Sequence, residues 1–458
     1  MTSKIFERIA GELEEIPLVD THEHLQPQIG TSRKDISLFS VLKEFVVDDL
    51  ISAGMEAAEP DNMQAEPSAQ WERIKPYLPH VQTTTYFRFH LAAFRALFDF
   101  RDEEIHDRNW LELSERIIEA NKKDDWYKTV LKDKANLEIA FLDRKLSDEW
   151  NVNSQLLVPL GEEEIDRNLY LPVLRADSFL YRCSRSAIEK TNLTAQRKKG
   201  WGLRIDLLDR LIEEWGMPVK TLEDYLALID TAFQRTVMVG GVAVKLICAY
   251  ERSLRFEAVT RREAEEIFVR HPDDITVSDA TQFEDFILRV IVERAIENDL
   301  PIQIHTGMQA GNGNILNNAN PLHLNNLFLE YPEAKFDVFH GGIPFTEELG
   351  ILSKTFPNVY INLCFMPQLS DTFTKHALST LIDLVPGNKF LWGGDCYHVE
   401  VFYGTMLISK KVVAEVLAQK VSDGCFGMNA ALDLSKKIFR DNALKLYRPE
   451  KKLTINNQ

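Results

Sequence analysis

Strand-like and helical segments alternate along most of this 458-residue chain. From residue 137 onward, short apolar runs typical of buried strands are separated by stretches whose apolar residues recur with helical spacing. With one similar run near the N-terminus, the strand-like segments number eight and lie at residues 16–21, 137–142, 170–174, 241–250, 300–305, 336–340, 358–364 and 390–395. Strands that alternate with helices pair in parallel through right-handed crossovers, and eight such units close into a barrel. We therefore predict an α/β protein with a (β/α)8 barrel.

The helices of this pattern are expected at residues 221–237, 260–270, 280–298, 320–330, 343–356, 372–385 and 412–419. Residues 31–136 interrupt the alternation, since they contain no convincing strand but many aromatic residues in helical patterns. An insertion after the first strand leaves the barrel at the face where barrel active sites lie. We therefore predict a barrel domain made of residues 1–30 and 137–458, and a helical cap, residues 31–136, that closes over the site.

Residues able to bind a metal stand at the ends of several predicted strands. His22 and His24 are two residues apart, so on a strand both imidazoles point to the same face. His305, His340 and Asp395 end later apolar runs, at the face of the barrel that carries active sites. Imidazoles together with a carboxylate are typical ligands of zinc and related divalent ions. One histidine at a strand end is a weak signal, but four of them with an aspartate predict a metal centre.

Lys245 is a second unusual residue, because it lies inside the apolar run 241–250. A lysine is almost never fully buried unless its charge is paired, so this position calls for a specific partner or function. One interpretation is a structural lysine, ion-paired in the barrel core, and the other places its amine in the active site.

Charge and composition exclude several classes of partner and location. The formal net charge of −17 argues against nucleic acid or an anionic membrane as a partner, since both require a basic surface. No apolar stretch is long enough for a membrane helix, and the acidic N-terminal segment does not resemble a signal peptide. The five cysteines contain no CxxC pair, which indicates reduced and mostly buried thiols. We therefore expect a cytoplasmic protein with a small-molecule substrate, and the oligomeric state stays open, a homo-oligomer included.

The assembled residues resemble the amidohydrolase superfamily of metal-dependent barrel enzymes. Its pattern is HxH after strand 1, Lys or Glu after strand 4, His after strands 5 and 6, and Asp after strand 8. The matching residues, in the same order, are His22, His24, Lys245, His305, His340 and Asp395. Residues 245–254 and 320–324 are similar to the amidohydrolase-related branch that includes domains fused to glutamine-synthetase-type proteins. The long helical insertion and the segment 94–98 resemble uronate isomerases.

The resemblance implies a role for each of these residues. His22, His24 and Asp395 would hold one divalent metal, with zinc as the expected ion. His305 and His340 would hold a second metal or polarise the substrate carbonyl. Lys245 would be carbamylated and bridge two metals, whereas an unmodified ammonium there would pair with Asp395 or with a substrate carboxylate. Asp395 would also act as general base and then general acid.

The expected function is a metal-dependent hydrolase that attacks a small amide, ester or lactone with metal-activated water. Three alternatives remain: a uronate isomerase-like aldose–ketose isomerase, a one-metal decarboxylase of the same fold, and a non-catalytic barrel that serves as a binding module. The last is the weakest, since no ligand of the pattern is missing. Arg88, Arg182 and Arg252 are the candidates for binding a substrate carboxylate through bidentate hydrogen bonds.

Overall fold

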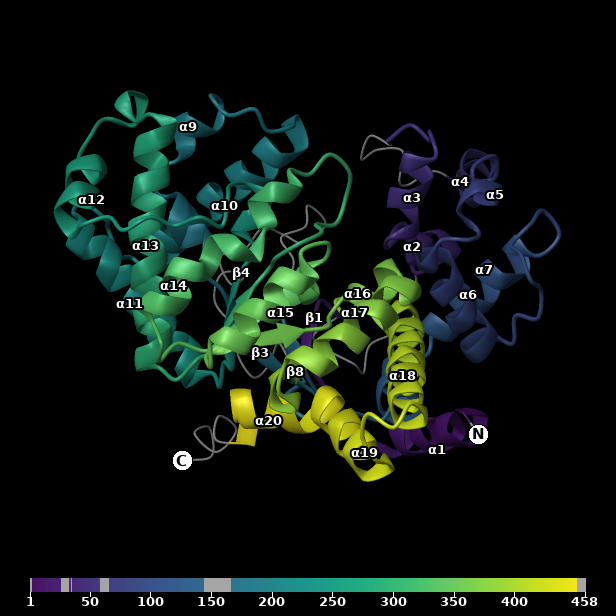
Figure 1. The fold of residues 1–458 in the computed structure, drawn as a ribbon. Coiled ribbons are helices and arrows are strands. Elements are labelled where there is room, and N and C mark those ends of the chain that lie inside the picture. Colours follow the sequence, from purple (N-terminus) through teal and green to yellow (C-terminus); the bar gives the residue numbers. More distant parts are fainter. Residues whose placement is uncertain (1, 26–32, 34, 58–65, 144–165, 451–458) are drawn as a thin grey trace.

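The computed structural model describes residues 2–25, 33, 35–57, 66–143 and 166–450, and eight parallel strands form its centre (Figure 1). The strands are β1 (Leu18–Glu23), β2 (Leu137–Leu142), β3 (Tyr170–Arg175), β4 (Ala243–Leu246), β5 (Ile302–Ile304), β6 (Phe336–Val338), β7 (Val359–Asn362) and β8 (Phe390–Leu391). Each strand pairs with the next one along the chain. Backbone bonds from Thr21 N–H to Trp392 O, 3.2 Å, and from Asp395 N–H to His22 O, 2.8 Å, link the last strand to the first. The predicted (β/α)8 barrel is confirmed.

Helices surround this barrel in the order expected from the sequence. The chain opens with α1 (Thr2–Glu15), which precedes β1. The helices that follow β3 and the later strands are α9 (Arg185–Ile188), α10 (Ala195–Glu214), α11 (Leu222–Met238), α12 (Arg261–Phe268), α13 (Val277–Glu297), α14 (Asn325–Glu330), α15 (Thr346–Thr355), α16 (Met366–Leu369), α17 (Asp371–Leu384), α18 (Val399–Ser422), α19 (Met428–Lys436) and α20 (Asn442–Tyr447). The pairs Thr221–Asp224 and Thr260–Glu263 open α11 and α12 as reciprocal capping boxes.

Several predicted boundaries differ from the structure, mainly where strands end. The predicted strand 241–250 stops at Leu246, because the chain leaves the sheet for a 3-10 turn at Cys248–Tyr250. His340 likewise lies in a 3-10 turn after β6 rather than on the strand. The helix predicted at 412–419 is only part of the 24-residue α18. Because α18 packs against α1, α6 and α17, it is buried on more than one side and lacks the one-sided pattern of a surface helix.

The described part of residues 31–136 is helical. It contains α2 (Leu38–Lys43), α3 (Val46–Ser52), α4 (Pro67–Ile74), α5 (Leu78–Val81), α6 (Thr85–Phe98), α7 (Trp110–Asn121) and α8 (Trp126–Lys128), followed by a π-helical turn, Thr129–Lys134. Figure 1 shows α2–α7 gathered on one side of the barrel, next to α18. We refer to α2–α8 as the cap.

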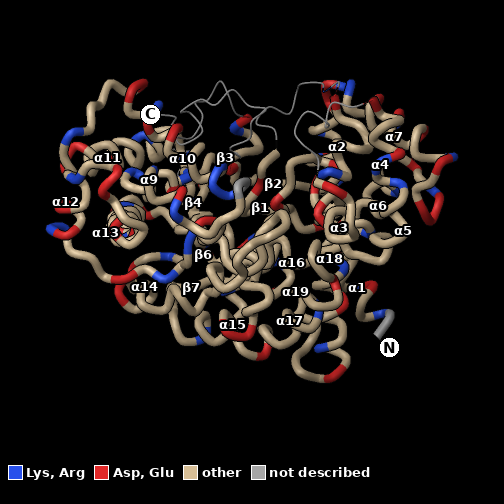
Figure 2. Tube along the Cα trace, turned by 90° about the horizontal axis from the view of Figure 1, so that it is seen from above, with Lys and Arg blue, Asp and Glu red and all other residues tan. Residues whose placement is uncertain are grey.

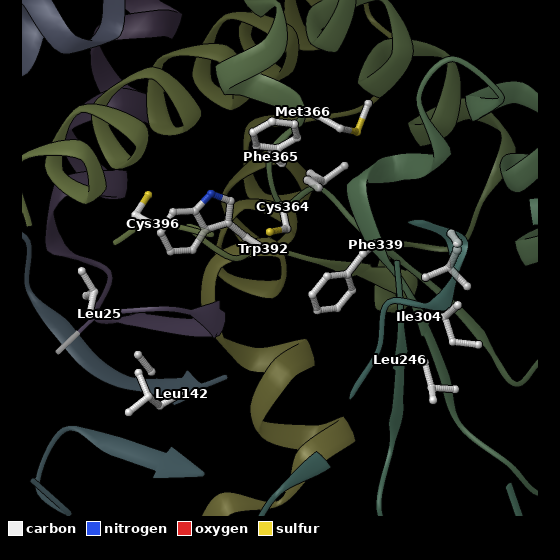
Figure 3. Packing of buried hydrophobic residues seen from close by; sticks show 14 of the residues in the cluster. Leu25, Leu142, Leu246, Ile304, Phe339, Cys364, Phe365, Met366, Trp392 and Cys396 are labelled. Atoms are coloured by element: carbon white, nitrogen blue, oxygen red, sulfur yellow. The ribbon is translucent and has the colours of Figure 1, made fainter. Parts of the chain in front are cut away.

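The barrel interior holds an apolar cluster and buried polar side chains. Val19, Phe141 and Leu391 pack with Tyr447 of α20. In the adjoining polar group, Asn362 Nδ2 donates to Asp337 Oδ2, 2.9 Å, and Gln303 Nε2 donates to the Tyr447 hydroxyl, 3.0 Å. Figure 3 shows part of the packing where strands end, including Phe339, Cys364 and Trp392. This arrangement leaves the carboxyl ends of the strands for the polar groups of a site.

The surface carries both signs of charge over its outer helices (Figure 2). Among the described residues, no helix combines the length and the apolar character needed to span a membrane. All five cysteines are free, and four of them are buried, in agreement with the expected reduced thiols.

Gly404 of α18 lies against α6 of the cap, so its substitution tests how much this close packing contributes to stability. A Cβ at this position would lie 2.6 Å from Phe89 O and 3.2 Å from Ala93 Cβ, both on α6. Because the obstacle is backbone, we expect Gly404→Ala to lower the free energy of unfolding by about 1–3 kcal/mol, measured by urea denaturation. Gly202→Ala is the matched control, since it is also helical but has no atom within 4 Å, and it should raise stability by up to about 1 kcal/mol. Equal stability of Gly404→Ala and the wild type would contradict the close contact.

Candidate metal centre

Three predicted ligands converge where β1 meets the segment after β8. His22 Nε2 lies 3.4 Å and His24 Nε2 lies 3.2 Å from Asp395 Oδ1. Asp395 reaches this position through a left-handed backbone, φ 59°, which a residue with a side chain adopts only when its surroundings hold it there. The neighbouring Gly394 has no room for a side chain, because a Cβ there would lie 1.8 Å from Glu23 Oε1. The close approach of these two segments therefore sets the position of the carboxylate.

The hydrogen bonds of His24 decide which of its nitrogens faces Asp395 as a lone pair. His24 Nδ1 is bonded to the backbone oxygen of Asp143, and a carbonyl can only accept. Nδ1 therefore carries the proton in the neutral ring, and Nε2 points its lone pair toward the Asp395 carboxylate. Asp143 is itself held by Arg175, whose Nε donates to Asp143 Oδ1 at 3.0 Å and whose Nη2 donates to Oδ2. This outer partner orients the imidazole as the supporting residues of metal sites do.

His305 and His340 form a second convergent pair, in which the facing atoms are again lone pairs rather than a donor and an acceptor. His340 Nδ1 donates to Cys364 O at 3.1 Å, and His305 Nε2 donates to Met308 O at 3.1 Å. The other two nitrogens, His340 Nε2 and His305 Nδ1, then face each other as lone pairs only 2.9 Å apart. Two bare lone pairs at this distance repel each other unless a proton or a cation lies between them.

A divalent cation fits this arrangement of donor atoms. Two imidazole nitrogens bound at about 2.0–2.1 Å to a tetrahedral ion lie about 3.3 Å apart, so the 2.9 Å between these two nitrogens requires only a small separation. Ligand atoms of His22, His24 and Asp395 all lie within 4.8 Å of one another, and so do those of His340, Cys364 and Asp395. Among the described residues, His22 Nδ1 has no hydrogen-bond partner. Burial lowers the pKa of His22 to about 3 and that of His340 to about 4, so both rings are neutral and able to coordinate at neutral pH.

The carboxylate of Asp395 is the anionic member of this set. Burial by itself would raise the pKa of Asp395, but the neighbouring His22 and His24 lower it well below its usual range. Its side chain is 16 % exposed, compared with 3 % for His22 and 7 % for His24. Asp395 is therefore the most solvent-exposed of these three candidate ligands.

Lys245 is buried in β4 and is not ion-paired in the way that the structural interpretation requires. Among the described residues its Nζ has no hydrogen-bond partner, and it lies 3.4 Å from the centroid of the Phe339 ring. Burial lowers the pKa of Lys245 to about 8, with Asp143 and Asp395 acting in the opposite direction. A buried amine with a lowered pKa is a reactive group beside the candidate ligands.

Two buried carboxyls that the sequence did not point to lie beneath the ligands. Asp20 Oδ1 accepts from His22 N–H, 2.9 Å, and from Gly394 N–H, 3.1 Å, while Glu23 Oε2 accepts from Cys396 N–H, 2.9 Å. Burial raises the pKa of Asp20 to about 7 and that of Glu23 well above its usual range. Both join β1 to the loop that carries Asp395. The signal for them was the polar sequence Asp20 to Glu23 within a fully buried strand.

The three arginines predicted to bind substrate are engaged elsewhere. Arg88 of α6 donates to Asp371 at 3.3 and 2.8 Å and joins the cap to α17. Arg182 pairs with Asp209, 3.0 Å, and Arg252 is buried between Glu284, 2.9 Å, and Asp285, 2.6 Å. Because carboxylates of this chain already neutralise all three guanidinium groups, the geometry gives that prediction no support. Arg175, which sequence reasoning missed, lies closer to the ligands; a charged residue at the end of a buried strand was its only signal.

We predict that the convergent histidines and Asp395 jointly coordinate a metal ion. His24→Ala and Asp395→Ala should each lose most of the metal found in the wild-type protein by elemental analysis, with an unchanged circular dichroism spectrum. His271→Ala is the control, because this histidine is exposed and distant in sequence from the ligands, and its metal content should match the wild type. Full metal content in His24→Ala would contradict the assignment.

Comparison with known proteins supports the same assignment of fold and family. The family model described as "Amidohydrolase" matches residues 217–448, about half of the chain, which contain Lys245, His305, His340 and Asp395. The protein fluG of Emericella nidulans is 26 % identical over 238 residues, which are 49 % of this chain and 27 % of fluG. The match thus spans only about a quarter of the length of that relative.

Similar solved structures extend the likeness to nearly the whole chain. Uronate isomerase from Thermotoga maritima has a TM-score of 0.75 at 16 % identity and 97 % coverage of both chains. Glucuronate isomerase from Caulobacter crescentus has a TM-score of 0.75 at 16 % identity, with 98 % of this chain and 94 % of that chain covered. A putative metal-dependent hydrolase from Lactobacillus casei has a TM-score of 0.58 at 15 % identity, with coverage of 97 % and 98 %. These likenesses are likenesses of fold. Together with the matched family model, they lead to one conclusion: this chain belongs to the amidohydrolase family.

Proposed function

We propose that this protein is a cytoplasmic metal-dependent hydrolase that cleaves a small amide, ester or lactone. The observation that carries the proposal is the convergence of His22 and His24 on one carboxylate, Asp395, near the facing nitrogens of His340 and His305. Zinc is the proposed ion, because imidazole and carboxylate ligands suit it and its bound water is acidic enough to form hydroxide at neutral pH. The free thiols accord with a reducing compartment.

Each residue has a defined part in this proposal. His22, His24 and Asp395 would hold one metal ion, and His305 with His340 would hold a second or face the substrate carbonyl. Asp395, the most exposed of the first three, takes the proton of the attacking water and delivers it to the leaving group. Arg175 and Asp143 keep the His24 ring in the orientation and tautomer that this requires.

Lys245 would contribute as a carbamate rather than as an ammonium ion. Its lowered pKa, about 8, leaves part of the amine neutral at neutral pH, and only a neutral amine combines with carbon dioxide. A carbamate carries negative charge and two oxygen ligands, which would balance the cations held by the histidines. An unmodified ammonium would instead add positive charge beside them.

A carboxylate-bearing substrate would meet a guanidinium at the loop after β5. Arg197 of α10 lies 4.4 Å from the centroid of the Tyr250 ring, and Tyr250 packs on His305 with a centroid distance of 4.9 Å. Asp48 of the cap accepts from Gly311 N–H at 2.9 Å, which connects this loop to the cap. We propose that Arg197, in place of Arg88, is the substrate-facing arginine.

An oxygen-isotope experiment separates hydrolysis from isomerisation. We would supply N-acyl amino acids, esters, lactones and hexuronates to the zinc-loaded protein in water enriched in 18O, and analyse products by mass spectrometry. The hydrolase proposal predicts that one substrate of the first three classes gains solvent oxygen in a new carboxyl group. Asp395→Ala, in the same assay, should abolish the label. Conversion of a hexuronate to its keto isomer, with no turnover of the other classes, would overturn the proposal in favour of an isomerase.

Carbamylation of Lys245 can be tested without knowing the substrate. Protein incubated with zinc and 13C-bicarbonate should give a carbamate carbon signal by NMR that is absent from Lys245→Ala. Lys389→Ala is the matched control, since burial also lowers the pKa of Lys389 to about 8, but its Nζ donates to Val359 O at 3.1 Å and to Pro357 O. A signal that persists in Lys245→Ala, or no signal in the wild type, would show that Lys245 is not carbamylated.

A further inference from the structure

Cys364 lies inside the candidate metal centre, although no strand-end pattern in the sequence pointed to it. Its Sγ and the ligand atoms of His340 and Asp395 all lie within 4.8 Å of one another. The residue is fully buried, two positions beyond the end of β7. Figure 3 shows its side chain among buried apolar residues, near Trp392 and Phe365. β7 thus supplies a potential ligand in addition to those from β1, β5, β6 and β8.

The backbone of Cys364 is held on both sides of its side chain. Cys364 N–H donates to Asn362 Oδ1 at 3.0 Å, and Cys364 O accepts from His340 Nδ1 at 3.1 Å. The next residue, Phe365, adopts a left-handed backbone with φ 67°, and its ring packs against the His340 ring with a centroid distance of 5.5 Å. The Cys364 carbonyl thus fixes the tautomer of the His340 imidazole, and the Cys364 sulfur lies within 4.8 Å of a ring nitrogen of His340.

The Cys364 thiol belongs to the buried apolar core and also lies near polar groups of the candidate site. Lys245 Nζ, fully buried and without a hydrogen-bond partner among the described residues, lies near enough to interact electrostatically with Cys364. A purely structural cysteine needs only apolar neighbours, as a small hydrophobic residue does. The Cys364 sulfur also lies within 4.8 Å of potential ligand atoms of His340 and Asp395.

We propose that Cys364 is a further ligand of the metal centre, adding one thiolate to its imidazole and carboxylate donors. The inference rests on the proposed metal-dependent function, since it requires an ion at this place. Coordination forms a sulfur–metal bond, breaks the S–H bond and releases one proton to solvent. A thiolate donor favours zinc, cobalt and cadmium over magnesium and manganese, so Cys364 would set the metal preference of the site.

Cobalt substitution reports this bond directly, whatever the substrate. The metal-free protein is titrated with Co2+, and the near-ultraviolet thiolate-to-cobalt charge-transfer band is recorded for the wild type, Cys364→Ser and Cys396→Ser. Cys396 is the matched control, because it is also buried and adjoins Asp395, but its Sγ donates to Gly394 O at 3.1 Å. We expect the band in the wild type and in Cys396→Ser, and its loss in Cys364→Ser. Loss of a group that only supports a metal ligand already weakens metal binding by roughly tenfold. We therefore expect Cys364→Ser, which loses a ligand itself, to bind Cd2+ more than about tenfold more weakly than the wild type.

The outcomes separate the two proposals. If the wild type binds Co2+ without a charge-transfer band, or if the band survives in Cys364→Ser, the role of Cys364 is overturned while the metal-dependent hydrolase stands. If neither Co2+ nor Zn2+ binds to the wild type, the proposed function itself fails. Should Cys364→Ser fold poorly, 113Cd NMR of the wild-type protein decides the same question, because a sulfur ligand shifts the cadmium resonance far downfield of an all-nitrogen-and-oxygen set.

Discussion

Repulsion between lone pairs is the physical constraint around which this site is built. His340 Nε2 and His305 Nδ1 lie 2.9 Å apart, and His24 Nε2 lies 3.2 Å from the Asp395 carboxylate. The opposite nitrogen of each of these rings is bonded to a backbone carbonyl, so in the neutral rings the facing nitrogens carry no proton. In a buried space of low polarity such an arrangement is costly without a cation. The fold holds it in place, and the proposed divalent ion would relieve it.

The surrounding structure shows what keeps these atoms together. His340, Phe365 and Asp395 all have left-handed backbones, a conformation that costs of order 1–3 kcal/mol for each residue with a side chain. Asp20 and Glu23 tie β1 to the loop of Asp395, while Asn362 ties β7 to Cys364. Strain of this kind persists only where neighbouring contacts fix the geometry. The packing of the barrel thus holds the candidate ligand atoms in fixed positions.

The cap is connected to the same loops that carry the ligands. Glu44, directly after α2, accepts from the backbone N–H groups of Tyr397 and His398 at 2.8 and 3.1 Å, and from His398 Nδ1 at 2.7 Å. The Tyr397 ring in turn stacks on His24 at a centroid distance of 4.7 Å. A change in the cap can therefore reach a ligand through two contacts. This gives the insertion after β1 a role in shaping the site, separate from any contact with substrate.

The sequence alone predicted the barrel, its strand order and the convergence of His22, His24, His305, His340 and Asp395 at one end. These features depend on local periodicity and on the rule that parallel strands present their carboxyl ends together, so they can be read from neighbouring residues. Tertiary structure decided the rest: which partners the imidazole nitrogens have, that Asp143 and Arg175 hold His24, that Cys364 lies near His340 and Asp395, and that Arg88, Arg182 and Arg252 are paired with carboxylates. Each of these depends on partners far away in the chain, and sequence spacing carries no information about which distant side chain occupies the space beside a given residue.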